Sequence, residues 1–574
     1  MPSFPQLLVA RLTKALDTLG LPTDVAAVTT ATDPRFGHYQ SNAAMVIGKQ
    51  QKENPRLIAQ RLADVLAPDD TFEKPEVAGP GFLNFRISPA ALQARLAQIA
   101  ADPKLGVAPS AERRRIVIDF SAPNIAKPMH VGHLRSTIIG DSLARVARFL
   151  GHHVITDNHI GDWGTQFGMI VFGWKHYVRQ DALQADPITE LVRVYREVNA
   201  KAKAIPAFRD ACKDELVKLQ AGDPENLAIW KRAVALSLDS LRNIYSQLDI
   251  HFDHFLGESA YNDRLASLVD KLIADGTATE SDGAICIFFP EKSELADKPF
   301  LIRKADGGFL YSTTDLATID YRLGVWGADD IWYIVGDPQS LHFRQLFAAA
   351  RLRGQEAGFA HVAHGSILGK DRKLMRTRSG ESVGLTDVLD EAIARARTIV
   401  DEKNPDLPEA EKAAIAETIG IGSVKYAELS QHRMTNYVFD WDKMLALNGA
   451  TAPYLQNSYV RIRSIFRRLG EPFNAASAAS AAPLVLEDPQ ELSLAFKLAQ
   501  FAEVVPEVLH DFRPNVLALY LLELARGFHS FYEACPVLRS EGTTRTSRLV
   551  LCDATSRILA QGLDLLGIRV TERM

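Results

Sequence analysis

Short apolar runs alternate with helical periodicity in the middle of the chain. Residues 116–120 form a β-branched run that predicts a buried strand. Between residues 130 and 150, apolar positions recur three to five apart, which predicts a helix ending before Gly151. A second strand is expected over 153–157. This β–α–β unit predicts an open parallel sheet, which binds nucleotides beyond its strand ends and against a helix N-terminus.

The same patterns divide the chain into three parts. Residues 1–112 predict a small α+β domain, and residues 113–440 an α/β Rossmann-like domain with a parallel sheet. That domain is interrupted at about 175–300 by an insertion, with helices expected over 188–202, 207–220 and 223–248. Residues 441–574 predict an all-α helical bundle, because helical periodicity continues there without strands. The Ala/Ser-rich tract 475–482 predicts a surface linker.

Composition narrows the class of protein. Hydrophobic residues make up 47% of the chain and charged residues 24%, as in ordinary globular proteins. The net charge of −5 means that nucleic-acid binding would depend on local basic patches. The four cysteines lack metal-site spacing, and no apolar stretch suits a signal peptide or membrane span. We therefore expect a reduced, cytoplasmic enzyme with no membrane contact and no structural metal.

The strongest candidate chemistry is the pair His130 and His133, separated by Val131 and Gly132 at the expected helix start. Imidazoles one turn apart share a face and can both donate hydrogen bonds to phosphate oxygens. Gly132 leaves room for a flat base against the backbone. A chance occurrence is one alternative. A zinc site is another, although no third ligand is placed nearby.

Other candidate segments have plain structural alternatives. Gly161 lies in a polar segment after the second strand, which suits either a ligand cleft or a simple turn. Asp315 follows Ser312 by three residues, a spacing that by itself favours a capping-box acid at a helix start. Gln339 follows a buried-type strand over 331–335, on the ligand side of the expected sheet.

These motifs together resemble a known family. The His-x-Gly-His segment resembles the nucleotide-binding signature of class I aminoacyl-tRNA synthetases, and its flanks, 119–124 and 134–137, resemble the arginyl-tRNA synthetase version. The resemblance covers nearly the whole chain. It implies ATP-dependent ligation of L-arginine to tRNA(Arg) through an arginyl-adenylate, with Mg²⁺ accompanying ATP as substrate, in a monomer. The ATP-binding residues that it implies are Pro123, Asn124, His130, Gly132, His133 and Gly161.

The resemblance also implies a set of arginine ligands. A planar guanidinium with five donors needs carboxylates and amides around it. The family places an acid and an Asn around the first strand, a Tyr and an Asp before a later helix, and a Gln after the next strand. In this chain these positions are held by Asp119, Asn124, Tyr311, Asp315 and Gln339.

A second family signature, Lys-Met-Ser-Lys-Ser, corresponds to residues 369–380. Aligned on Met375, both signature lysines are replaced, by Leu374 and Thr377. Other cations remain in this segment, and Lys127 precedes the histidines. The catalytic set implied is His130, His133, Lys127, Lys370 and Arg378. The family also needs tRNA for adenylate formation, and ordering of this loop by tRNA is a physical reason for that need.

Two regions are candidates for contacting tRNA. Segment 36–42 mixes aromatic and amide side chains, which suits stacking on unpaired bases, or else forms a capped loop with a half-buried tyrosine. The helix expected from residue 453 carries several arginines, which suit RNA contacts or a solvated face equally. The residues implied are Phe36, Tyr39, Gln40, Asn42, Arg461 and Arg468. The rival functions are another nucleotidyl-transfer enzyme and a non-catalytic RNA-binding paralogue.

Overall fold

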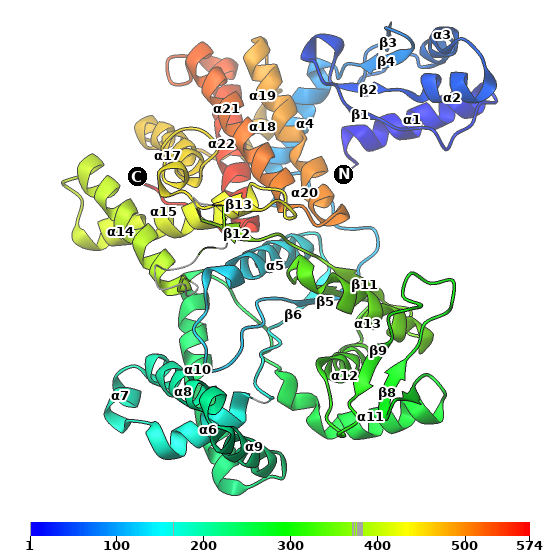
Figure 1. Cartoon of the computed structure of the whole chain (residues 1–574). Coiled ribbons are helices and arrows are strands. Elements are labelled where there is room, and N and C mark those ends of the chain that lie inside the picture. The colour runs from blue at the N-terminus through cyan, green and yellow to red at the C-terminus, as the bar shows by residue number, and fades with distance from the viewer. Residues whose placement is uncertain (1, 165, 370–371, 374, 376–382) are drawn as a thin grey trace.

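The computed structural model describes residues 2–164, 166–369, 372–373, 375 and 383–574. Figure 1 shows a small α+β domain at the top right, a helical bundle beside it and an α/β domain below both. This is the predicted fold class, which is therefore confirmed.

A four-stranded parallel sheet lies at the centre of the α/β domain. Its order is β11–β10–β5–β6, with β5 (Arg115–Asp119), β6 (His153–Asp157), β10 (Asp330–Tyr333) and β11 (Gly358–His361). Helix α5 (Val131–Phe149) connects β5 to β6 as predicted. Gly151 follows α5 with a φ of +91°, the left-handed conformation that commonly ends a helix.

Both faces of this sheet are covered. Ile116 and Ile118 of β5 pack in one apolar cluster with Leu134 of α5. Val117, between them, packs in a second cluster with α12 (Tyr311–Gly324) and α13 (Ser340–Leu352). Because side chains of a strand alternate between faces, a strand covered on both sides is a continuous apolar run.

The chain between β6 and β10 forms two groups of elements. One, at the lower left of Figure 1, is a helical cluster made of α6 (Gln166–Tyr177), α7 (Gln180–Ala185), α8 (Pro187–Ala204), α9 (Pro206–Gln220) and α10 (Pro224–Gln247). The other combines η2 (Glu258–Tyr261) and α11 (Asn262–Ala274) with an antiparallel sheet of β7 (Thr279–Ser281), β8 (Ala284–Ile287) and β9 (Phe300–Arg303). The three long helices expected here are present.

The N-terminal domain packs helices on a short antiparallel sheet. The sheet order is β1–β2–β4–β3, with β1 (Thr29–Thr30), β2 (Tyr39–Ser41), β3 (Glu76–Ala78) and β4 (Phe82–Phe85). The accompanying helices are α1 (Phe4–Thr18), η1 (Pro34–Phe36), α2 (Ala43–Gln51) and α3 (Pro55–Val65). Helix α4 (Pro89–Ala101) follows, and it packs against the C-terminal bundle.

The C-terminal bundle contains α17 (Ala452–Leu469), α18 (Ala475–Ala481), α19 (Pro489–Ala499), α20 (Phe501–His510), α21 (Pro514–Ala534) and α22 (Gly542–Leu565). The linker predicted over 475–482 is wrong, because most of this tract is helix α18. The side chain of Asn474 caps that helix by accepting from the Ser477 N–H (2.9 Å), and α18 packs against α4 and α22. The high helix propensity of alanine outweighed the compositional argument for a linker.

A connecting region lies between the sheet and the bundle. It contains β12 (Ile367–Leu368), α14 (Leu385–Lys403), α15 (Glu409–Leu429), β13 (Tyr437–Val438) and α16 (Trp441–Met444), with β12 and β13 paired in parallel. The short η3 (Asp337–Gln339) instead joins β10 to α13. The four cysteines are buried and unpaired. None of the helices that the structure describes combines the length and apolar character needed to cross a bilayer.

Candidate active site

The loop between β5 and α5 has a strained backbone. Ser121, Ala122 and Ala126 all have positive φ, at 74°, 45° and 57°. Residues with a side chain adopt this conformation only when their surroundings enforce it. The Ser121 N–H donates to Ser136 Oγ (2.9 Å), and the Ser121 hydroxyl bonds to Tyr245 of α10 (2.7 Å). The insertion therefore fixes the loop that leads to the histidines.

The two histidines form a reciprocal cap at the start of α5. His130 Nδ1 accepts from the Gly132 N–H (3.0 Å), and His133 Nδ1 accepts from the His130 N–H (3.1 Å). Their ring centroids are 3.9 Å apart. Because a backbone N–H only donates, both Nδ1 atoms are acceptors, and each neutral ring carries its proton on Nε2.

Both rings are neutral at pH 7. Burial lowers the pKa of His130, and burial together with His130 lowers the pKa of His133 to about 4. The pair therefore offers two Nε2–H donors without positive charge. A Cβ on Gly132 would lie 2.8 Å from the His130 ring. Glycine is thus required by the capping ring itself, whatever its role toward a base.

A cavity of about 480 Å³ opens beside these rings. Its lining brings together five of the predicted ligands, which follow the carboxyl ends of the neighbouring parallel strands β5 and β10: Asn124, His130, Gly132, His133 and Gln339. Part of the remaining lining comes from the loop after β11, including His364 and Ser366.

Two predicted ATP ligands lie outside the lining of this cavity. The Gly161 N–H donates to the Pro123 carbonyl (3.1 Å). A Cβ on Gly161 would lie 2.2 Å from Asn124 Oδ1. Pro123 and Gly161 therefore act on the cavity by holding Asn124 in place.

A second group of polar side chains gathers around the start of α12. Asp315 accepts from His342 of α13 (Nε2 to Oδ2, 2.6 Å). Burial, followed by the charges of Asp315 and Asp162, raises the pKa of Glu258 to about 8. Burial and the carboxylates of Glu258 and Asp315 also raise the pKa of Tyr311. Within the described part of the chain, neither Glu258 nor Asp315 pairs with a Lys or Arg. This region therefore favours a cationic ligand.

The capping-box interpretation of Asp315 is wrong. Helix α12 begins at Tyr311, and its reciprocal contact runs from the Leu310 N–H to Thr313 Oγ1 (3.4 Å). Asp315 lies in the second turn, beyond the free N–H groups that a capping acid would serve. Its carboxylate is available for another role.

Comparison with known proteins places these features in a family. Residues 95–441 match "tRNA synthetases class I (R), catalytic domain", residues 6–87 match "Arginyl tRNA synthetase N terminal domain", and residues 455–574 match "DALR anticodon binding domain". The chain belongs to the arginyl-tRNA synthetase family.

Members of the arginyl-tRNA synthetase family match this chain over nearly its full length. The arginine–tRNA ligase of Laribacter hongkongensis is 44% identical over 99% of both chains. That of Synechococcus elongatus is 45% identical over 95% of this chain and 94% of its own. The crystal structure of arginyl-tRNA synthetase from Plasmodium falciparum matches with a TM-score of 0.86 at 28% identity, and the Thermus thermophilus enzyme with 0.82 at 27%, each covering both chains completely.

Asp119 does not fit the arginine-ligand role predicted for it. Arg322 Nη2 lies 2.6 Å from Asp119 Oδ2 and 2.7 Å from Asp157 Oδ2, and all three side chains are buried. Asp119 therefore already has a buried cationic partner, which it shares with Asp157. No local pattern predicts this ion pair, because Arg322 lies 203 residues further along the chain.

Of the three basic residues in the predicted catalytic set, only Lys127 lies within the described part of the chain. Lys127 is exposed, outside the cavity lining, with its Nζ 5.6 Å from the ring centre of Tyr195. Lys370 and Arg378 lie outside the described residues, whereas Met375 lines the cavity. Met375, on which the second signature is aligned, thus borders the cavity beside the histidines.

Most of the predicted tRNA ligands are at the surface. Phe36 is 48% exposed and Gln40 is half-buried. Asn42, Arg461 and Arg468 are exposed, and Arg461 bonds to His529 (3.0 Å).

Tyr39 differs from the other predicted tRNA ligands. It is fully buried, its hydroxyl donates to Glu503 of α20 (2.5 Å), and its ring lies edge-on to Phe496. It joins the N-terminal domain to the bundle and has no ring face free for a base.

Glu258 is a candidate ligand that no sequence pattern predicted. It begins η2, after a turn within the predicted insertion, and no motif surrounds it. Only its closeness to Asp315 and Tyr311 in the folded protein marks it as a ligand candidate. A lone glutamate in a polar segment carries no local signal that would have revealed this.

Proposed function

We propose that the cavity beside His130 and His133 activates arginine with ATP, as the first step of its ligation to tRNA(Arg). The overall reaction is that of the family: arginine and ATP form arginyl-adenylate and pyrophosphate, and the tRNA then accepts the arginyl group. The observation that carries the residue-level proposal is the pair of neutral rings with both Nδ1 atoms bonded to backbone.

In the adenylation step, an arginine carboxylate oxygen attacks the α-phosphorus of ATP. The bond from this phosphorus to the bridging oxygen breaks, and pyrophosphate leaves with the electron pair. Negative charge on the phosphate oxygens receives hydrogen bonds from the Nε2–H groups of His130 and His133. Neutral donors suit this role, since each N–H is fixed by a bond on the opposite ring nitrogen. Mg²⁺ enters with ATP as part of the substrate.

Glu258, Asp315, Tyr311 and Gln339 form the proposed arginine pocket. Asp315 is oriented by His342, and Glu258 adds a second carboxylate that a guanidinium would keep ionised. Asn124 lies in the cavity lining beside the histidines, where it can bond to arginine or to ATP. Neither step needs a protein nucleophile, because positioning and charge stabilisation are sufficient.

The predicted domains take separate parts in binding tRNA. The domain over 1–112 contacts tRNA through Phe36, Gln40 and Asn42, and the domain over 441–574 through Arg461 and Arg468, all at least partly exposed. The domain over 113–440 holds the chemistry, with Lys127, Lys370 and Arg378 supplying charge to the triphosphate. We propose that the enzyme acts as a cytoplasmic monomer.

The test measures tRNA charging and ATP–pyrophosphate exchange for each of the twenty amino acids, with tRNA present. Arginine alone is expected to support both reactions. Exchange with another amino acid would contradict the arginine pocket. Absence of exchange with all of them, from folded protein that still binds tRNA, would favour the RNA-binding paralogue.

A further inference from the structure

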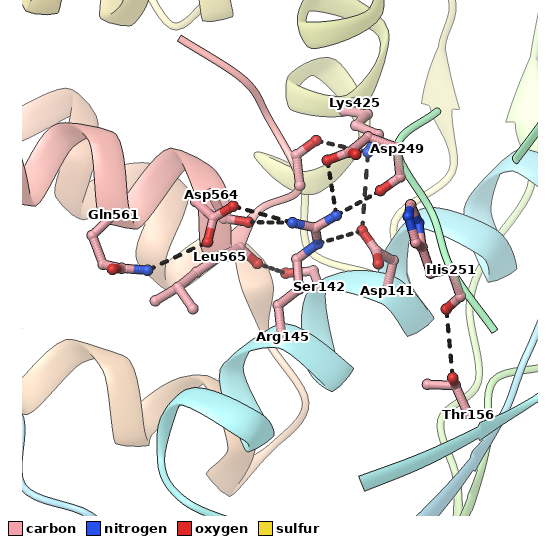
Figure 2. A network of polar contacts seen from close by, with 11 residues as sticks. Asp141, Ser142, Arg145, Thr156, Asp249, His251, Lys425, Gln561, Asp564 and Leu565 are labelled. Atoms are coloured by element: carbon pink, nitrogen blue, oxygen red, sulfur yellow. Dashed lines mark hydrogen bonds and ion pairs between the residues drawn. The ribbon is translucent and has the colours of Figure 1, made fainter. Parts of the chain in front are cut away.

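The C-terminal half of helix α5, away from the histidines at its start, contacts the C-terminal segment of the chain. Arg145 lies twelve residues after His133, about 18 Å along the helix axis. Its Nη1 donates to Asp564 Oδ1 of α22 (3.1 Å), and the preceding Ser142 hydroxyl donates to the Leu565 carbonyl (2.9 Å). The signature helix therefore contacts the last helix of the C-terminal bundle directly (Figure 2).

The guanidinium of Arg145 joins three segments. It contacts Asp141 on α5 itself (2.9 Å), Asp249 just after α10 (3.1 Å) and Asp564 near the end of α22 (3.1 Å). Beside it, Lys425 of α15 is 1% exposed and donates to the Gly567 carbonyl (2.7 Å). We call Asp141, Arg145, Asp249, Lys425, Asp564 and the Gly567 carbonyl the junction network; Figure 2 shows it around Arg145.

The network is closely packed. Gly567 has a φ of +67°, and a Cβ there would lie 2.6 Å from Asp141 Oδ2 and 2.8 Å from Lys425 Nζ. Burial lowers the pKa of Lys425 to about 8 and raises the pKa of Asp141, although each charge opposes the shift of the other. Buried charges of this kind are costly when a partner moves away, so a shift of one segment is resisted unless its partners shift with it.

A second contact joins α5 to α15 close to the active site. Arg135, two residues after His133, forms a buried ion pair with Glu428 and also donates to the Thr435 carbonyl (2.8 Å). Arg135 lines the cavity that holds the histidines. Since Lys425 and Glu428 lie one turn apart on α15, the two contacts make α5 and α15 move together.

From this geometry we propose that Arg145 and Lys425 are positioning residues, through which the C-terminal bundle sets the place of His130 and His133 in the cavity. The bundle is where the proposed function seats tRNA, so the inference rests on that function. tRNA bound to the bundle then favours one position of α22 and the C-terminal tail, and the junction network passes this constraint to α5.

The experiment compares full-length variants Arg145→Met and Lys425→Met with Arg148→Met. Arg148 is the matched control: it lies one turn further on α5 and pairs with Asp253 (2.8 Å), within the α/β domain. For each protein we would measure kcat for arginylation, KM for arginine, the dissociation constant for tRNA and thermal unfolding. Activities are taken well below the melting temperature and expressed per folded molecule.

We expect the turnover number to fall about tenfold or more in Arg145→Met and Lys425→Met, since small misplacements of reacting groups have effects of this size. KM for arginine and the affinity for tRNA should stay within about twofold, because neither variant touches a ligand. Arg145→Lys should recover part of the loss, as a lysine reaches one of the three acids. Arg148→Met should keep its kcat.

Wild-type kcat in folded Arg145→Met and Lys425→Met would overturn the proposal, even if both melt at lower temperature. If both variants fail to fold, Gly567→Ala tests the same contact by crowding it, and an unchanged kcat there would also overturn it. Failure of the wild-type protein to charge arginine would refute the proposed function. A wild-type protein that charges arginine, with unaffected variants, refutes only the junction network.

Discussion

The histidine side of the proposed active site is built from four consecutive residues, whereas its acidic side draws on three segments between residues 258 and 342. On the histidine side, the ring nitrogens bond to the backbone of the same turn, so the donors are placed as soon as α5 forms. On the acidic side, Glu258 and Asp315 are brought together by the tertiary fold, and burial together with the charge of Asp315 raises the pKa of Glu258. In the proposed function, the histidine side stabilises negative charge that appears during the reaction. The acidic side binds the positive charge of the arginine substrate.

The largest effect should come from the histidine side. His133→Ala is expected to reduce tRNA-supported ATP–pyrophosphate exchange by about 10²–10³, the usual loss for one donor to a developing charge. KM for arginine should change little, because the acidic side is intact. The measurement is initial exchange rate at saturating substrates, with His130→Ala expected to behave alike. Full activity in folded His133→Ala would remove its catalytic role.

Asp315→Asn should weaken arginine binding at the acidic side of the proposed active site. It removes one charged hydrogen bond to the guanidinium, worth about 1.5–3 kcal/mol, so KM for arginine should rise by about tenfold or more. The kcat at saturating arginine should stay close to wild type. Asp320→Asn is the matched control on the same helix, where Asp320 pairs with Arg353 (2.7 Å). Equal KM values for the two variants would show that Asp315 is not a ligand.

Glu258 should make arginine binding depend on pH. With its pKa near 8 in the empty site, the carboxyl must lose a proton to meet a guanidinium as an anion. KM for arginine should therefore fall by roughly tenfold between about pH 6.5 and 8.5 in the wild type. In Glu258→Gln it should be nearly constant and higher at the upper end. A wild-type KM independent of pH would contradict this account of Glu258.

The same shift predicts a change in stability. A carboxyl whose pKa rises from 4.5 to about 8 on folding contributes stability that is present below pH 4.5 and lost as the pH rises through 8. Glu258→Gln should thus melt at a higher temperature than wild type at pH 8–9 and at the same temperature below pH 4.5. Thermal unfolding followed by circular dichroism checks this sign.

The smallest expected effects concern Tyr39 and Phe36, which lie in the same segment of the N-terminal domain but should differ in their effect on tRNA binding. Tyr39→Phe removes the bond to Glu503 and should cost about 1 kcal/mol of stability without changing KM for tRNA. Phe36→Ala should raise KM for tRNA several-fold, since stacking on a base is worth about 1–3 kcal/mol. Charging assays across tRNA concentrations compare the two. A larger tRNA effect from Tyr39→Phe would contradict the structural role of Tyr39.

Local signals in the sequence determined the elements and the histidine side. The β-branched run, the helical periodicity after His130 and the position of Gly151 predicted β5 and α5 because each depends on neighbours within a few residues. The family resemblance extended this to Asn124, Gln339 and Asp315. The prediction of a linker over 475–482 failed, because it was based on Ala/Ser composition, whereas the tract forms helix α18.

Only the tertiary structure decided which charges are free to bind a ligand. Asp119 matches a ligand position of the family but pairs with the buried Arg322. No sequence pattern marks Glu258, whose environment depends on Asp315 in the folded protein. Tyr39, predicted to stack on a base, is buried between two domains. The junction network likewise joins residues from 141 to 567. Whether an ionisable side chain is paired or available depends on partners that can lie hundreds of residues away. Local sequence patterns cannot predict such partners.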